Sequence, residues 1–201
     1  MHRTVFSLAG LALAAGTALS AAPPAGAATT ALMDFPSGRT TGYIVNVNSG
    51  LCLQPSGENF FGNGDPIVQR GCNGSVAQLW VLVPIGTKSF YSGVFFSVDH
   101  ASHRIFNAGS GLCLDDRDGI SSDGAAVQQW ACNTTSTTMQ WGAFPDLNGN
   151  HVIANVRASN KRSHLIVLGV EGESVFEDAP VQLFEAGQPP PSREWVYQQV
   201  S

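Results

Sequence analysis

Short runs of alternating apolar and polar residues recur along the chain, and residues that favour turns separate these runs. In the sequence Tyr-Ile-Val-Asn-Val at residues 43–47, one face of an extended segment is apolar and the other carries a polar group. Alternation of this kind predicts a β-strand that is buried on one side. The Asn-Ser-Gly, Gly-Asn-Gly and Asp-Gly sequences between runs are typical of tight turns. The pattern therefore predicts an all-β domain of many short strands.

The runs fall into three related units with a period of somewhat more than ~50 residues, the spacing of a repeat architecture. The sequence Ser-Gly-Leu-Cys-Leu occurs at residues 49–53 and again at residues 110–114. The third unit is less regular, and its alignment places Leu165 and Ala186 at the two cysteine positions. Each unit closes on a tryptophan, at Trp80, Trp141 and Trp195.

One unit of this size cannot bury its apolar face alone. Three units packed around an axis share a core and leave few sheet edges exposed. Because the three closing tryptophans stand at equivalent places, we expect them to pack in that core rather than at a ligand site. The composition agrees, since 43% hydrophobic residues suffice for a core and 22 glycines and 11 prolines provide turns.

The charge of the chain argues against a nucleic-acid partner. Charged residues make up only 12% of the sequence, and the formal net charge is −5. The densest basic spot is the pair Lys161-Arg162. Binding of nucleic acid requires a patch of basic side chains that faces the phosphates, and the sequence shows none.

The first 27 residues have the organisation of a secretory signal peptide. Arg3 provides the positive start, residues 5–15 are apolar, and a small-residue Ala-Gly-Ala sequence ends at the expected cleavage point. The apolar stretch is too short to span a membrane. We therefore expect a secreted, extracellular protein without membrane insertion, in which residues 28–42 form a flexible leader.

All four cysteines follow this segment, at Cys52, Cys72, Cys113 and Cys132. An even number of cysteines in an exported chain predicts disulfides, and counting alone allows three pairings. Nearly equal gaps in nearly the same local sequence favour the pairs Cys52–Cys72 and Cys113–Cys132. The sequence has no Cys-x-x-Cys pair, which argues against a structural metal site.

The pattern Ser-Gly-x-Cys-Leu, then Val-Gln-x-Trp-x-Cys, then a closing Gln-x-Trp resembles the ricin B-chain-like lectins, also known as carbohydrate-binding module family 13. The resemblance implies an all-β fold over residues 43–199, a β-trefoil with three pseudo-symmetric repeats and two intra-repeat disulfides. It also implies a carbohydrate partner, of galactose or xylan type. The Gln-x-Trp motif is intact only at residues 78–80.

A shallow sugar site needs a carboxylate or an amide for pairs of hydroxyl groups and a flat aromatic surface for the apolar face of the ring. The second unit offers Asp115 shortly after one cysteine, and Gln128 and Trp130 shortly before the next. In the resembled family these positions hold the aspartate that binds hydroxyls, a glutamine and the stacking aromatic. We therefore expect one sugar site, in the second repeat.

The second unit departs from the family pattern before its closing tryptophan, where an Asn-Gln pair is usual. Thr138 and Met139 stand there, and we expect the adjacent Gln140 to substitute as the amide. The other two units are weaker candidates, because Gln54 replaces the aspartate in the first and Val167 is expected to replace it in the third.

The sequence favours a binding protein over an enzyme. Glycoside hydrolysis needs two placed carboxylates, and the acidic residues here fall in expected loops. Nucleophile and phosphate-loop motifs are absent from the sequence, and we expect no cofactor. The alternative is a protein-interaction or inhibitory trefoil that has lost sugar binding, with Phe60-Phe61 and the three prolines at residues 189–191 as its contact features.

Overall fold

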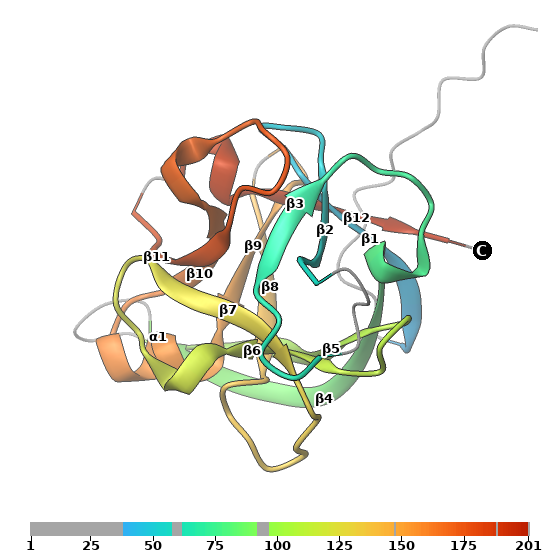
Figure 1. Ribbon diagram of the computed structural model, residues 1–201. Helices are drawn as coiled ribbons and strands as arrows, with labels where there is room; N and C mark the ends of the chain where they lie inside the picture. The colour runs from blue at the N-terminus through green and yellow to red at the C-terminus, as the bar shows by residue number, and fades with distance from the viewer. Residues whose placement is uncertain (1–37, 58–61, 92–96, 147, 188, 201) are drawn as a thin grey trace, which may run out of the picture. The chain divides into compact units, whose positions relative to one another are not determined.

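The computed structural model describes residues 38–57, 62–91, 97–146, 148–187 and 189–200 (Figure 1). These residues belong to one compact unit, Leu32–Ser201. The predicted signal peptide, most of the predicted leader and Phe60-Phe61 lie outside the described residues. In the described residues, no helix is long and apolar enough to cross a membrane.

Twelve strands of the described residues join in one hydrogen-bonded sheet. The strands are β1 (Thr40–Asn46), β2 (Cys52–Pro55), β3 (Ile67–Arg70), β4 (Leu79–Tyr91), β5 (Ser97–Asn107), β6 (Cys113–Asp116), β7 (Ala125–Trp130), β8 (Trp141–Pro145), β9 (His151–Asn155), β10 (Ile166–Val170), β11 (Val181–Glu185) and β12 (Trp195–Gln199). The helical segments are α1 (Val156–Arg162) and the short 3-10 turns η1 (Val76–Gln78), η2 (Arg117–Gly119), η3 (Glu171–Glu173) and η4 (Pro191–Arg193).

Six of these strands close into a ring of antiparallel pairs. The order around the ring is β1, β4, β5, β8, β9 and β12, and β12 returns to β1. The other six strands form three hairpins, β2–β3, β6–β7 and β10–β11. Each repeat thus contributes two strands to the barrel and one hairpin, which confirms the predicted β-trefoil.

The first strand begins earlier than the sequence pattern indicated. The leader predicted over residues 28–42 overlaps this strand, because residues 40–42 already belong to β1. Thr40 pairs with Leu82 of β4, and Gly42 pairs with Gln199 of β12. The alternation of side chains begins only at residue 43, so the pattern could not mark this start.

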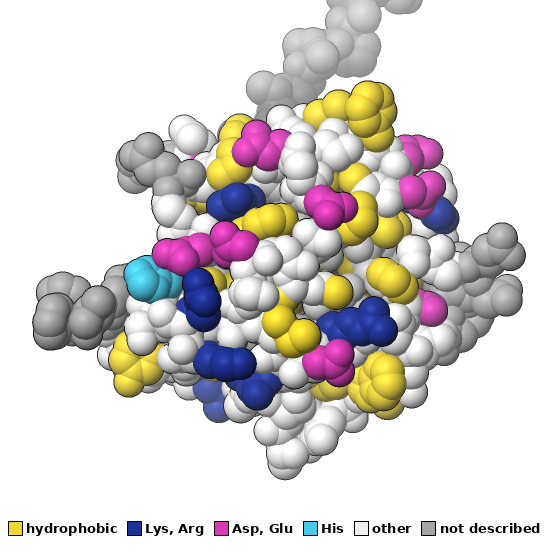
Figure 2. Space-filling model, turned by 60° about the vertical axis from the view of Figure 1, so that its left-hand side comes forward, with side chains coloured by type: hydrophobic (Ala, Val, Ile, Leu, Met, Phe, Trp, Pro, Cys, Tyr) yellow, Lys and Arg dark blue, Asp and Glu magenta, His cyan; other side chains and the backbone are white. Residues whose placement is uncertain are grey.

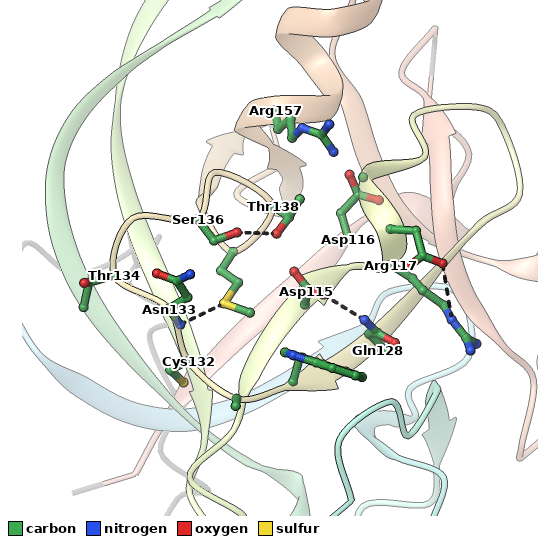
Figure 3. Close-up of a pocket in the computed structure, with 15 residues that line it drawn as sticks. Asp115, Asp116, Arg117, Gln128, Cys132, Asn133, Thr134, Ser136, Thr138 and Arg157 are labelled. Carbon is green, nitrogen blue, oxygen red and sulfur yellow. Dashed lines mark hydrogen bonds and ion pairs between the residues drawn. The ribbon is translucent and has the colours of Figure 1, made fainter.

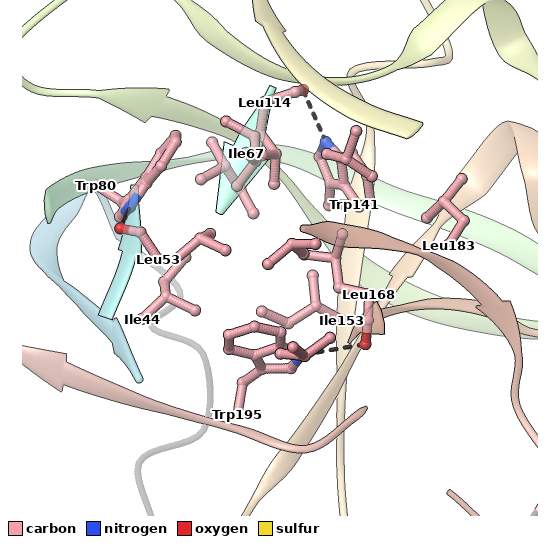
Figure 4. Close-up of a cluster of buried hydrophobic side chains, with 14 of the residues drawn as sticks. Ile44, Leu53, Ile67, Trp80, Leu114, Trp141, Ile153, Leu168, Leu183 and Trp195 are labelled. Atoms are coloured by element: carbon pink, nitrogen blue, oxygen red, sulfur yellow. Dashed lines mark hydrogen bonds between the residues drawn. The ribbon is translucent and has the colours of Figure 1, made fainter. Parts of the chain in front are cut away.

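The three closing tryptophans lie in the core, as predicted, and are fully buried (Figure 4). Each indole Nε1 donates a hydrogen bond to the backbone oxygen of a leucine in the same repeat, so its polar atom is satisfied at no cost to packing. The three bonds are Trp80 to Leu53 at 2.8 Å, Trp141 to Leu114 at 3.0 Å and Trp195 to Leu168 at 3.1 Å. They define which positions of the three repeats are equivalent.

Both predicted disulfides are present and join equivalent places in the first two repeats. Cys52–Cys72 and Cys113–Cys132 each have a Cα–Cα separation of 5.1 Å. In each case the first cysteine begins the outer hairpin, and the second lies just after its returning strand. The disulfides therefore hold the loops that follow β3 and β7.

The third repeat replaces a turn with a helix. In the first two repeats, Asn46 and Asn107 use their Oδ1 atoms to accept two backbone N–H groups of the following turn. Asn155 stands at the same place, and its Oδ1 accepts from the backbone nitrogen of Ala158 at 3.0 Å. Asn155 therefore caps the N-terminus of α1, and this helix lies beside the second repeat.

The surface carries both signs of charge. On the face drawn in Figure 2, several Lys and Arg side chains gather at the lower left, while others lie beside Asp and Glu side chains, with apolar groups among them. The basic groups on this face therefore do not form one continuous field.

Candidate functional site

A hollow of about 880 Å³ opens on the second repeat (Figure 3). Three parts of the chain line it: the hairpin β6–β7 with the η2 turn, the loop after Trp130, and Arg157 from α1. The lining combines carboxylates, two amides, hydroxyl groups and one large aromatic ring. Its residues are Asp115, Asp116, Arg117, Asp118, Gly119, Gln128, Trp130, Ala131, Cys132, Asn133, Thr134, Ser136, Thr138, Met139 and Arg157.

Three of the four predicted site residues come together in this pocket. Asp115 pairs with Gln128 across the β6–β7 hairpin, and Gln128 Nε2 donates to Asp115 Oδ2 at 2.9 Å. The other carboxylate oxygen, Asp115 Oδ1, is buried and has no hydrogen-bond partner. Trp130, two residues along the same strand, leaves 43% of its surface exposed. The pocket thus offers an unused charged acceptor beside an accessible aromatic ring.

The first repeat supports the position of Trp130. The backbone nitrogen of Gly64 donates to the oxygen of Gln129, and Gln129 donates back to the oxygen of Asp65. Gly64 has a φ of +89°, and a Cβ at this position would lie 3.4 Å from the indole ring. Asn63 Oδ1 accepts from the nitrogen of Ala131 at 2.6 Å. The loop of the first repeat therefore fixes the strand that carries the tryptophan.

The fourth predicted residue, Gln140, is not among the residues that line the pocket. It is buried, and its backbone oxygen accepts from the nitrogen of Val156 at the start of α1. Met139 takes the pocket-facing place, with its sulfur accepting from the nitrogen of Asn133 at 3.3 Å. The structure thus places Met139, and not Gln140, at the pocket, because the chain does not shift by one residue here.

In the first repeat the equivalent place is closed by two amides. Gln54 corresponds to Asp115, and its Oε1 accepts from Gln78 Nε2 at 2.9 Å. Arg70 corresponds to Trp130, because each pairs with the first cysteine of its hairpin. Arg70 forms an ion pair with Asp178 of the third repeat. At these two positions the described part of the first repeat therefore offers neither a free acceptor nor an aromatic platform.

In the third repeat the alignment differs by two residues from the one expected. The bond from Trp195 makes Leu168 the counterpart of Leu114, so Val167 stands at the first cysteine position and Gly169 at the position of Asp115. Neither Leu165 nor Val167 has the place predicted for it, because helix α1 replaces the turn that guided the alignment. Ala186 keeps its predicted place, two residues after the aromatic.

An arginine occupies the space of a ligand in the third repeat. Phe184 corresponds to Trp130, and the Arg193 guanidinium carbon lies 4.7 Å from the centre of its ring. Arg193 Nη1 also donates to the oxygen of Glu185 at 2.9 Å. A Cβ on Gly169 would lie 2.7 Å from Arg193 Cγ. The aromatic face of this repeat is therefore covered from within.

Sequence reasoning gave no role in the site to two residues of the pocket, Asp116 and Arg157. Asp116 ends β6 and is 0% exposed, and both of its carboxylate oxygens lack a hydrogen-bond partner. Burial, and next the charge of Asp115, raise the pKa of Asp116 from 3.8 to about 7. Two consecutive acids at the end of a buried strand were a signal for Asp116. Arg157 comes from another repeat, and its local sequence gives no such signal.

Within the described ranges, no group of three or more His, Cys, Asp or Glu side chains is arranged to hold a metal ion. His100 Nδ1 lies 3.0 Å from the oxygen of Ala101, and its ring packs on Phe144 at 4.2 Å between centres. The acidic residues at positions 116–119 form a tight turn, η2, in which Asp118 adopts a φ of 58°.

Comparison with known proteins agrees with this geometry. The family described as ricin-type beta-trefoil lectin domain-like matches residues 94–184, which include the second repeat and much of the third. No curated protein sequence matches the chain.

Solved structures with the same fold are numerous and distant in sequence. A designed threefold-symmetric protein, ThreeFoil, has a TM-score of 0.64 and 22% identity, over 78% of this chain and 96% of ThreeFoil. The Rhizoctonia solani agglutinin has a TM-score of 0.61 and 17% identity, over 84% of this chain and 99% of the agglutinin. An exo-β-1,3-galactanase from Clostridium thermocellum has a TM-score of 0.65 and 24% identity, over 80% of this chain but only 30% of the enzyme. These likenesses show the β-trefoil fold.

Proposed function

We propose that this protein binds carbohydrate through the pocket of the second repeat. Asp115 accepts hydrogen bonds from neighbouring hydroxyl groups of the sugar, and the amide of Gln128 also forms hydrogen bonds with them. Trp130 stacks on the apolar face of the sugar ring. The observation that carries this proposal is Asp115 Oδ1, which is buried in the pocket without a partner. A buried acceptor of this kind is costly unless a donor reaches it.

The comparison among the three repeats supports this choice of site. The second repeat combines an unpartnered carboxylate oxygen with an exposed aromatic ring. In the first repeat Gln78 Nε2 already donates a hydrogen bond to Gln54 Oε1. In the third repeat the Arg193 guanidinium covers the ring of Phe184. The other repeats have thus replaced ligand contacts with contacts inside the protein.

The similar proteins support carbohydrate as the ligand class. The matching family is described as lectin domain-like, and structures with the same fold include an agglutinin and a galactanase. We infer a galactose- or xylan-type glycan, bound without catalysis by a secreted protein. A single shallow site gives a dissociation constant of roughly 10 µM to 1 mM, and a polymeric glycan would raise the retention by avidity.

Tryptophan fluorescence provides a direct test. The chain has four tryptophans, and three of them are buried, so quenching by acrylamide reports mainly on Trp130. A bound sugar should protect this signal in proportion to saturation. Retention on immobilised galactan and xylan, together with a glycan array, then identifies the ligand.

Matched variants locate the site. Trp130→Ala and Asp115→Asn should abolish retention, while Phe176→Ala should keep it, because Phe176 is 76% exposed outside the pocket. Thermal melts confirm that each variant is folded. If Trp130→Ala binds as well as wild type, the site is elsewhere; if the folded wild type binds no glycan, the proposed function is wrong.

One further observation favours the alternative of a protein-binding trefoil. Val175 and Phe176 project from a loop whose backbone is clamped, because Gln69 Nε2 donates to the oxygens of Ser174 and Phe176. A rigid loop with two exposed apolar side chains suits a protein contact. This function predicts that Phe176→Ala, and not Trp130→Ala, abolishes the biological activity of the protein.

A further inference from the structure

Asp115 and Asp116 together present three buried oxygens without a hydrogen-bond partner: Oδ1 of Asp115 and both oxygens of Asp116. Both residues line the same pocket. The vicinal hydroxyls of a neutral sugar supply two donors, and Asp115 and Gln128 already account for them. Binding of a neutral sugar therefore gives Asp116 no role.

The charges around Asp116 do not neutralise it. Asp115 and Asp118 add negative charge on the same turn, and Arg157 and Lys161 of α1 oppose them. Among the described residues, none of the ion pairs within 4.0 Å includes Asp116. Arg117 is directed to Asp118, at 4.0 Å. A compact cation with several donors is the group that this corner lacks.

We propose that the pocket selects a sugar that carries a primary ammonium group, with the ammonium between Asp115 and Asp116 and the ring on Trp130. This inference rests on the proposed function and narrows its ligand to amino sugars with a free amine. An ammonium group offers three N–H donors and a positive charge, and bonds between charged groups are about twice as strong as neutral ones. An N-acetylated amine lacks both the charge and two of the donors.

The side chain of Arg157 must move away before a ligand can reach Asp116. Its guanidinium lies over Gly119, where Nη1 occupies the space that a Cβ would fill. In Figure 3 its side chain lies on the side of the pocket nearest Asp116. Arg157 is partly exposed, and it belongs to none of the ion pairs within 4.0 Å in the described part of the chain. A long exposed side chain moves at low cost, and its withdrawal opens Asp116 to the ligand.

Two matched series of sugars test the proposal on the full chain. The first is galactose, galactosamine and N-acetylgalactosamine, and the second is glucose, glucosamine and N-acetylglucosamine. Binding is followed at pH 7 by protection of Trp130 from acrylamide. We expect the free amine to bind about tenfold tighter than its neutral and acetylated partners in at least one series. Methylamine alone, without a ring to stack, should not protect the tryptophan.

Asp116→Asn separates this inference from the proposed function. The variant should bring the ratio of amine to neutral affinity to about one, because it keeps the shape and removes the charge. Asp118→Asn, which removes an exposed charge from the same turn, should keep most of the preference. If the neutral sugar binds as tightly as its amine in both series, this inference alone is overturned. If none of the six sugars binds the folded protein, both proposals fail.

The pH dependence gives an independent signature. Burial and Asp115 raise the pKa of Asp116 to about 7 in the free protein, and a bound ammonium would lower it again. The complex then holds fewer protons than its components, so affinity for the amine should rise between pH 5 and about 7. Affinity for the neutral sugar should not follow that rise. Equal pH dependence for both ligands would contradict the proposal.

Discussion

Gln78 Nε2 donates a 2.9 Å hydrogen bond to Gln54 Oε1 in the first repeat, and the second repeat has no such bond at the equivalent positions. Met139 stands where Gln78 would be, and Asp115 stands where Gln54 would be. A thioether cannot donate a hydrogen bond, so Asp115 Oδ1 remains without a partner. The loss of one amide has opened an acceptor to the pocket.

Met139→Gln should therefore stabilise the protein. The new amide can donate to Asp115 Oδ1 and accept from the nitrogen of Asn133, as Gln78 accepts from the nitrogen of Asn73 at 2.9 Å. A satisfied buried acceptor contributes about 0.5–1.5 kcal/mol, so we expect the Tm to rise by about 2–4 °C. Differential scanning calorimetry checks this. A lower Tm would mean that Asp115 does not face residue 139.

Asp116→Asn should remove a pH-dependent loss of stability. The pKa of Asp116 is about 7 in the folded protein and 3.8 as the ordinary value, so between these pH values only the folded state keeps the proton. Stability from this group is therefore complete below pH 3.8, falls as the pH rises to about 7, and is constant above it.

The asparagine variant should gain stability over wild type across that window, by about 1.4 kcal/mol for each unit of pKa shift at most. Urea unfolding of both proteins between pH 4 and pH 8 measures the difference, and the subtraction cancels the other carboxylates. Asp118→Asn is the control, because its side chain is exposed and its charge is the smallest of the causes that act on the pKa of Asp116, so its difference curve should be much shallower. A flat curve for Asp116→Asn would show that its carboxylate is hydrated in solution.

The fold followed from the sequence where its signals were local and repeated. Cysteine spacing and the closing tryptophans recur in nearly the same context, so they identified the disulfides and the core before any coordinates. The pair Asp115 and Gln128 was also predictable, because both flank the disulfide on one hairpin.

The errors arose where the repeats stop being alike. Helix α1 replaces the turn of the third repeat, and without that turn the alignment placed Val167 two residues from its true equivalent. Gln140 is adjacent to Met139 in sequence, yet Met139 lines the pocket and Gln140 does not. Arg157 reaches the pocket only through the packing of one repeat on another, which no local pattern encodes.

Removing one disulfide should weaken binding more than removing the other. Replacing Cys113 and Cys132 together by Ala, or Cys52 and Cys72 together by Ala, opens a loop of 19 or 20 residues and costs about 3 kcal/mol in either case. Cys132 lines the pocket, whereas the Cys52–Cys72 disulfide only encloses the loop that supports Trp130, so the first double variant should weaken sugar binding more than the second. Urea unfolding and sugar titration of both variants provide the comparison. Equal losses of affinity would show a general effect of stability.

Arg193→Ala should uncover an aromatic ring without creating a sugar site. Loss of the cation–π contact with Phe184 and of the bond to Glu185 should cost about 1–2 kcal/mol, measured by urea unfolding. Gly169 has no side chain to take hydroxyl groups, so stacking alone should not retain a sugar. The decisive comparison is between the single variant Trp130→Ala and the double variant that also carries Arg193→Ala. The quantity compared is their retention on the glycan column. Retention restored by the second change would show that the carboxylate is dispensable, and it would overturn the role assigned to Asp115.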